Sequence, residues 1–209
     1  MDANAFCQQV LHDGLAVKHL VVGDDFRFGC DRQGNFDSLE NFGAQHGFDV
    51  ENTSSILNGE GSRISSSLVR QHLNQGDMVS AEAMLGHPIT LGGRVVSGQQ
   101  LARRLGFPTA NIFLKGVAPA LSGVYAVTVP VDGQEYSGVA NIGVRPTVDG
   151  KTPVLEVHLF NYSGDLYTRY LEVTFRHFIR PERKMSGLEE LEKQIQCDKE
   201  EALRFFSNQ

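Results

Sequence analysis

The sequence predicts an α/β region followed by an antiparallel β-barrel and a closing helix. Three observations in the 209 residues support this fold class. The first half alternates short β-branched runs with helical stretches, which is typical of a parallel sheet covered by helices. From Pro88 onward, polar and apolar residues alternate between glycine turns, which is typical of antiparallel strands. The end of the chain repeats apolar residues at near-helical spacing.

The first half contains five expected elements. The run VKHLVVG suits a buried parallel strand, because it is short, apolar and β-branched. A loop rich in glycine and aspartate follows it. Further on, a Gly-Asp break separates two helical stretches. The expected strands are residues 17–23 and 48–50, and the expected helices are residues 36–46, 67–75 and 79–86.

The second half predicts a small barrel or sandwich. Alternating side chains indicate strands at 125–131, 154–160 and 171–175, and Asp132-Gly133 is a strong hairpin signal. We expect a closed barrel, since closure removes exposed strand edges. The halves should meet between Gly86 and Ile89, which gives domains of residues 1–87 and 88–209.

The last element is an amphipathic helix that should lie on the barrel. Ser186 and Glu189 have the spacing of a capping box at its start. Its apolar face is formed by Leu188, Leu191, Ile195, Ala202, Leu203 and Phe206.

Composition limits the classes of function. The chain has 19 basic and 25 acidic residues, a net charge of −6, so we expect no nucleic-acid partner. Cys7, Cys30 and Cys197 match neither a disulfide framework nor a zinc spacing and predict free thiols. No apolar run is long enough for a membrane span. We therefore expect a cytoplasmic protein without a membrane partner, monomeric or weakly oligomeric.

The string GFPTAN (106–111) points to oxygen-ligand chemistry. Pro108 removes a backbone donor and holds Phe107 extended, so the segment runs as the entry to a strand. On extended backbone, Thr109 and Asn111 point to the same side. A hydroxyl and an amide oxygen together suit a magnesium nucleotide. A turn-capping role for this pair is equally compatible with the sequence.

The stretch before this string has the composition of a phosphate-binding loop. Backbone N–H groups freed by glycine, together with guanidinium groups, can close around a polyphosphate. A hairpin with glycine turns and solvated arginines is the more frequent meaning of such residues. The glycines are Gly92, Gly93, Gly98 and Gly106, and the arginines are Arg94, Arg103 and Arg104.

Two further stretches of the second half carry candidate residues. On the strand VLEVHLF, Glu156 and His158 share a face, and Glu156 could serve as a general base for a substrate hydroxyl. That face could equally be the solvated side of an antiparallel sheet. In ANIGVRPT, Arg145 is held ahead of a proline, in a loop that closes on a ligand or in an ordinary turn.

The first half offers a second candidate site. GDDFRFG, with Asp24, follows a buried strand, where open α/β sheets place their ligands. RISSSLVR places Ser65 and Ser66 at a helix start with Arg70 one turn in, which suits a phosphate. Either serine could instead serve only as the N-cap.

Taken in order, these strings resemble the bacterial bifunctional riboflavin kinase/FMN adenylyltransferase family (FAD synthetase). The resemblance spans practically the whole chain, and as a set the strings are highly specific. They are VVGDDFRFG, RISSSLVR, MLGHP, GRVVSG, RRLGFPTANI, GVYAV, GVANIGVRPTV, LEVHLF, IRPE and the closing helix.

The resemblance implies a riboflavin kinase barrel that phosphorylates the 5′-hydroxyl of riboflavin with MgATP, giving FMN. Thr109 and Asn111 would hold Mg²⁺ and the nucleotide phosphates, and Glu156 would be the general base. The loop from Gly92 to Gly106, with Gly98 and Arg103, would cover ATP. Arg145 and Arg180 would lie in loops over the flavin.

The chain also departs from the family pattern. Ser97-Gly98-Gln99 stands where His-Gly-Asp is expected, and Ala102-Arg103 stands where Gly-Arg is expected. No HxGH string occurs, so residues 1–87 would be a partial FMN adenylyltransferase domain, whose remnant site is Asp24, Ser65, Ser66 and Arg70.

Three other functions stay open at this point. The chain could carry FMN adenylyltransferase activity if the missing part is supplied, or bind flavin or nucleotide without turnover. An oligonucleotide-binding barrel is disfavoured by the acidic charge.

Overall fold

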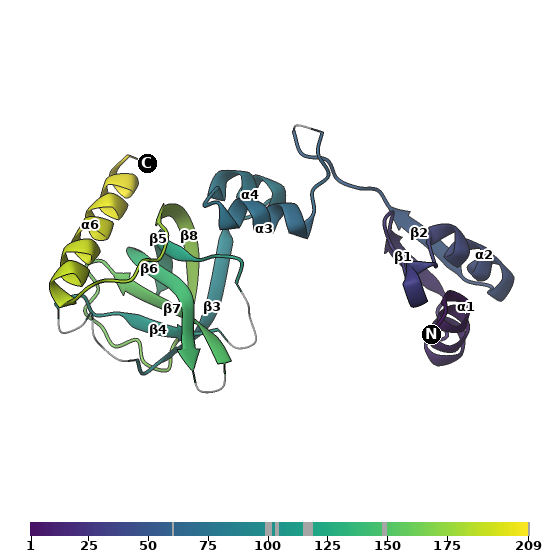
Figure 1. Ribbon diagram of the computed structural model, residues 1–209, viewed down its shortest axis with the longest axis horizontal. Helices are drawn as coiled ribbons and strands as arrows, with labels where there is room; N and C mark the ends of the chain where they lie inside the picture. Colours follow the sequence, from purple (N-terminus) through teal and green to yellow (C-terminus); the bar gives the residue numbers. More distant parts are fainter. Residues whose placement is uncertain (60, 99–101, 103–104, 115–118, 148–149, 209) are drawn as a thin grey trace. The chain divides into compact units, whose positions relative to one another are not determined.

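A computed structural model describes residues 1–59, 61–98, 102, 105–114, 119–147 and 150–208, with the side chains of 145–147 and 150–152 outside that description. The chain forms two compact units, Met1–Ile64 and Ser65–Gln209. Both are drawn in Figure 1, and each is described by itself.

The first unit is a small α/β layer. Strands β1 (His19–Gly23) and β2 (Asp49–Thr53) pair in parallel, and helix α2 (Phe36–His46) connects them, as the sequence predicts. Asn35 caps α2 reciprocally with Ser38, and Gly47 ends it in the left-handed region. A short core packs between the layers, formed by Cys7, Leu11, Val22, Phe28 and Leu39.

Three elements of this unit were not predicted. Helix α1 (Ala3–Phe6) continues into the π-helical segment η1 (Cys7–Gly14), and a 3₁₀ turn, η2, spans Cys30–Arg32. Only two buried residues of η1, Cys7 and Leu11, indicate its inward face, so its periodic signal is weak. Cys7, Cys30 and Cys197 are all free thiols, as expected.

Helices α3 (Ser66–Asn74) and α4 (Met78–Leu85) belong to the second unit. This compact unit therefore begins at Ser65, whereas the expected division between domains lies at 87/88. The reason is packing, since both helices bury apolar side chains in the core cluster of the barrel. The backbone at Gly76, between the helices, lies against the ring of Phe178. The buried helix residues are Val69, Leu73, Met78 and Ala81.

The second unit is a closed antiparallel barrel, which confirms the predicted fold class (Figure 1). Its strand order is β3-β4-β7-β6-β5-β8, and the predicted turn at Asp132-Gly133 joins β5 to β6 with φ of 52° and 81°. The strands are β3 (Ile89–Val96), β4 (Ala110–Phe113), β5 (Gly123–Val131), β6 (Gln134–Thr147), β7 (Gly150–Leu159) and β8 (Tyr170–Arg180).

Helix α6 (Leu188–Ser207) packs on the outside of the barrel, as predicted. The expected capping box named the wrong acidic partner for Ser186, whose partner is Glu190 and not Glu189. Gly187 is the N-cap, and the backbone N–H and hydroxyl of Ser186 both donate to the Glu190 carboxylate at 2.7 Å. Because the helix begins at Leu188, Glu190 and not Glu189 occupies the third position, from which a side chain can reach back.

Tyr125 in the barrel core predicts a loss of stability at high pH. Its side chain is fully buried, its hydroxyl donates to the Ser122 carbonyl at 3.1 Å, and burial raises its pKa to about 12. Between pH 10 and 12 the unfolded chain loses this phenolic proton while the folded chain keeps it, so the free energy of unfolding falls as pH rises. The full loss is about 3 kcal/mol.

Urea unfolding at pH 9 and 11, followed by far-UV circular dichroism, checks this expectation. Wild type should lose about 1 kcal/mol more than Tyr125→Phe between the two pH values, since the variant has no phenol at this position. Equal losses in both proteins would contradict a raised pKa.

Candidate active site

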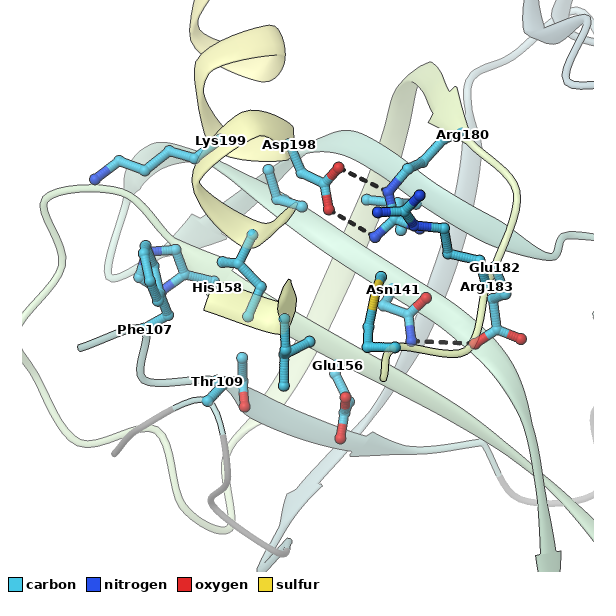
Figure 2. Close-up of a pocket in the computed structure, with 16 residues that line it drawn as sticks. Phe107, Thr109, Asn141, Glu156, His158, Arg180, Glu182, Arg183, Asp198 and Lys199 are labelled. Atoms are coloured by element: carbon cyan, nitrogen blue, oxygen red, sulfur yellow. Dashed lines mark hydrogen bonds and ion pairs between the residues drawn. The ribbon is translucent and has the colours of Figure 1, made fainter. Parts of the chain in front are cut away.

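The candidate site lies on the outer surface of the barrel, between helix α6 and residues of β5, β6, β7 and β8, with Phe107 and Thr109 just before β4 (Figure 2). A cavity of about 220 Å³ opens there. Apolar side chains from both the strands and the helix form part of its wall, including Val124, Val139, Leu191 and Ile195. Polar and charged groups complete the lining, among them Thr109, Asn141, Glu156, His158, Arg180, Glu182 and Asp198.

Strand register brings the predicted polar groups of β4 and β7 together. Asn111 pairs with Glu156, and Glu156 pairs on its other side with Asn141 of β6. Paired residues of neighbouring strands project from the same face of a sheet, so these three side chains form one row. Glu156 is half-buried and lines the cavity, beside helix α6.

Thr109 lies at the junction of two cavities. It lines the cavity that contains Glu156, and it also lines a second cavity of about 600 Å³. The second cavity is bounded by Val95, Val157 and the loop from Tyr162 to Tyr167. Of the residues expected to act on one phosphate, Thr109 and Glu156 therefore share a cavity, and Asn111 pairs directly with Glu156.

The glycines of the expected phosphate loop divide into two groups. Gly98 passes so close to the Asn111 amide that a Cβ there would collide with it, and Gly106 adopts a φ of +84° at the turn before Phe107. Gly92 lies inside β3 with the Tyr170 hydroxyl over it, so the expectation that a loop begins at Gly92 is wrong. Arg103 lies outside the described residues.

His158 fastens the GFPTAN segment to β7. Its Nδ1 is 2.9 Å from the Pro108 carbonyl oxygen, and its ring meets Phe107 edge-on at 5.6 Å. A carbonyl oxygen only accepts, so Nδ1 carries the proton. Burial lowers the pKa of His158, the Pro108 hydrogen bond opposes that shift, and the Lys199 charge adds to it.

Arg180, expected near a flavin, is engaged by α6. Its Nε and one terminal nitrogen donate to the two oxygens of Asp198 at 2.7 and 2.8 Å (Figure 2). Gln194 donates to the same carboxylate at 2.8 Å. The Asp198 side chain is only 5% exposed, so this ion pair joins β8 to α6 at the cavity wall.

A second polar contact involves Glu182, two residues after Arg180. The Asn141 amide donates to Glu182 at 3.2 Å (Figure 2). The Glu182 carboxylate lies directly over Gly143. Arg183 reaches Gln194 and Glu190 of the helix. Arg145 lies in β6 opposite Thr152, and its side chain is outside the described residues.

The residues of the expected adenylyltransferase remnant fall in different units. In the first unit, Asp24 accepts from the Ser55 hydroxyl at 2.5 Å and pairs with Arg63 at 3.2 Å. In the second, Ser65 is the N-cap of α3, as its alternative interpretation proposed, and its hydroxyl accepts from the Leu68 N–H. Ser66 and Arg70 are exposed on that helix.

Several cavity residues were not predicted as site residues, namely Phe107, Asn141, His158, Glu182, Arg183, Asp198 and Lys199. Asp198 had a detectable signal. It falls on the apolar face of the final helix with Leu191, Ile195 and Ala202, and a carboxylate on such a face requires a partner. The others depend on strand order and loop path, which the sequence does not state.

The donor set fits a magnesium ion. Mg²⁺ uses oxygen ligands and keeps several waters, so it needs few protein groups. Thr109 and Asn111 supply a hydroxyl and an amide oxygen, and Gly98 leaves room beside Asn111 that a Cβ would fill. Within the described ranges, no cluster of three His, Cys, Asp or Glu residues suits a metal.

Comparison with known proteins gives two family matches. The family model of riboflavin kinase matches residues 85–206, which is more than half of the chain. The family model of FAD synthetase matches residues 1–68. The two matches leave out residues 69–84, which include most of α3 and α4.

Individual relatives agree with these matches. The chain is 50% identical over 200 residues to a bifunctional riboflavin kinase/FMN adenylyltransferase of Pseudomonas fluorescens, and covers 64% of that protein and 95% of itself. It is 46% identical over 207 residues to the protein of the same description in Escherichia coli K12, covering 66% of that protein and 99% of itself. The chain thus spans just under two thirds of these relatives.

A solved structure shares the fold. It is titled as a macrolide-efflux protein from Streptococcus pneumoniae, with a TM-score of 0.71 and 30% identity over 98% of this chain and 65% of that one. Among the described residues of the present chain, we find no helix with the length and apolar character needed to cross a bilayer.

Proposed function

The chain belongs to the riboflavin kinase family, and from this premise we propose that it transfers the γ-phosphate of ATP to the 5′-hydroxyl of riboflavin, giving FMN and ADP. The observation that carries the proposal is the meeting of two cavities at Thr109, only one of which contains Glu156. Phosphoryl transfer between two substrates needs such a junction, with a base on the acceptor side.

The two cavities suit the two substrates. The cavity against α6 has apolar walls from Val124, Val139, Leu191 and Ile195, which suit the flat isoalloxazine ring. The second cavity, about 600 Å³, would hold the nucleotide, and its phosphates would point toward Thr109. The 5′-hydroxyl of riboflavin would then lie beside Glu156.

In the proposed mechanism, Glu156 accepts the proton of the 5′-hydroxyl as that oxygen attacks the γ-phosphorus. The new O–P bond forms as the bond to the β–γ bridging oxygen breaks, and ADP leaves with that electron pair. Thr109 and Asn111 orient the phosphates and would hold Mg²⁺, which neutralises phosphate charge when bound. Asn141, beside Glu156 in the strand register, contributes an amide on the acceptor side.

A direct assay tests the proposal. The chain is mixed with riboflavin, ATP and Mg²⁺, and FMN is followed by chromatography. Formation of FMN with stoichiometric ADP supports a kinase. Flavin binding without FMN from folded protein would instead select a binding module without turnover.

Gly98→Ala should impair the phosphate side of the site without unfolding the barrel. The new methyl group would meet the Asn111 amide, which is the end of a short side chain and can swing aside. We expect kcat to fall about tenfold, the scale of about 1.4 kcal/mol, because a proposed magnesium ligand is displaced. Steady-state kinetics measure this, with Gly59→Ala as the control, since a Cβ at Gly59 meets open space. Full activity of the Gly98 variant would contradict the assignment of Asn111.

The match of residues 1–68 to FAD synthetase supports a second function, FMN adenylylation. The observation that favours it is the retained parallel pair β1–β2 with Asp24 just after β1. Incubation with FMN, ATP and Mg²⁺ tests it by the appearance of FAD and pyrophosphate. If FMN remains unconverted, the adenylylation proposal is contradicted, and the kinase proposal is unaffected.

A further inference from the structure

The backbone around Thr109 is held from both sides, but by two different means. On its C-terminal side, Ala110 begins β4 and pairs with Val157 of β7. The ladder ends there, because Pro108 has no N–H to continue it. The carbonyl of Pro108 is instead taken by the side chain of His158, at 2.9 Å.

This contact fixes the peptide unit that leads into Thr109. The Pro108 carbonyl and the Thr109 nitrogen belong to one planar group, so holding the oxygen sets the direction of the backbone at Thr109. The His158 ring is itself held by edge-on contacts with Phe107 at 5.6 Å and Phe160 at 5.8 Å. Figure 2 shows His158 and Phe107 side by side at the cavity.

One strand therefore controls both sides of the proposed reaction. Glu156 and His158 are two residues apart on β7 and project from the same face. The spacing of the strand then fixes the carboxylate of Glu156 relative to the hydroxyl of Thr109.

We propose that His158 is a positioning residue, whose Nδ1–H holds the Pro108–Thr109 peptide so that Thr109 meets the transferred phosphate at a fixed distance from Glu156. This inference rests on the proposed kinase function for its effect on turnover. His158 does not itself exchange a proton with substrate. A donor at the Nδ1 position is what the role requires, and a charge on the ring is not.

Two substitutions separate the donor from the ring. His158→Leu keeps apolar volume and removes the donor, whereas His158→Asn keeps an amide N–H close to the position of Nδ1. We expect His158→Leu to lower kcat for FMN formation about tenfold, the scale of one hydrogen bond, with KM for riboflavin changed by less than about threefold. His158→Asn should recover most of kcat. Equal defects in the two variants, or wild-type kcat in His158→Leu, would overturn the proposal.

His177→Leu is the matched control. His177 is also half-buried, but its ring stacks on Phe205 of α6 at 4.8 Å and does not line the cavity. The kcat of the His177→Leu variant should equal that of wild type. A matching loss of kcat at His177 would show that the effect is a general loss of barrel order.

A measurement without turnover keeps the inference separate from the proposed function. Long-range ¹H–¹⁵N correlation of the wild-type protein identifies which ring nitrogen of His158 carries the proton. A protonated Nδ1 is expected, and the Thr109 amide resonance should shift in His158→Leu more than in His158→Asn. A bare Nδ1 with the proton on Nε2 would overturn the proposal even if FMN forms. Absence of FMN with a protonated Nδ1 would count against the kinase function alone.

Discussion

Glu156→Gln is expected to lower kcat for FMN formation by at least about 100-fold, the usual contribution of a general base. Glutamine has the same shape but cannot take the proton of the 5′-hydroxyl as that oxygen attacks. The side chain would still pair in register with Asn111 and Asn141, so the walls of both cavities should persist. Binding of ATP should therefore stay within a few-fold of wild type.

Steady-state kinetics and nucleotide titration together check this expectation. Glu172→Gln is the control, because Glu172 lies exposed on β8 opposite Gly92 and lines neither cavity. That variant should retain wild-type kcat. Normal turnover in Glu156→Gln would mean that another group takes the proton and that Glu156 has been misassigned.

The barrel was predictable because its local signals agree with its fold. Alternation in VLEVHLF separates Leu155, Val157 and Leu159, which fill the barrel, from Glu156 and His158 outside it. The turn at Asp132-Gly133 needs positive φ at both positions, and these residue types tolerate it. Such signals act over a few residues and are visible in sequence.

The neighbours of Glu156 were not predictable in the same way. β7 lies between β4 and β6, an order that alternation does not encode, so the row from Asn111 to Asn141 becomes visible only in the structure. Whether the outer face is wet or covered depends on where α6 packs. The boundary of the compact units at Ile64 and Ser65 has a related cause, because α3 and α4 bury their apolar faces against the barrel that follows them.

Asp198→Ala is expected to reduce the free energy of unfolding of the barrel unit by about 3–5 kcal/mol. The substitution leaves the Arg180 guanidinium, whose side chain is 20% exposed, without its two-oxygen partner at the wall of the cavity. Gln194 loses its acceptor as well. The free-energy cost of leaving a desolvated cation without a counter-charge is far larger than the net stabilisation that the intact ion pair provided.

The composition of the chain offers a selective probe of this unit. It contains no tryptophan, and all five tyrosines lie between residues 125 and 170, so tyrosine fluorescence reports on the barrel unit alone. Urea titration at pH 7 should show a lower midpoint for Asp198→Ala with a similar slope. Glu135→Ala is the control, since its pair with Arg176 is longer, 3.6 Å, and more exposed, and should contribute at most about 1 kcal/mol.

A double variant separates the two explanations for a loss of stability. If the loss comes from an unpaired charge, replacing both partners with apolar residues, as in Arg180→Met with Asp198→Leu, should restore much of it. If it comes from lost attraction between β8 and α6, the double variant should be as unstable as Asp198→Ala. Because Arg180 and Asp198 both line the proposed flavin cavity, the double variant should also bind riboflavin more weakly even where its stability recovers. Stability and affinity would then depend on the same ion pair for different reasons, packing of the helix in one case and shape of the cavity in the other.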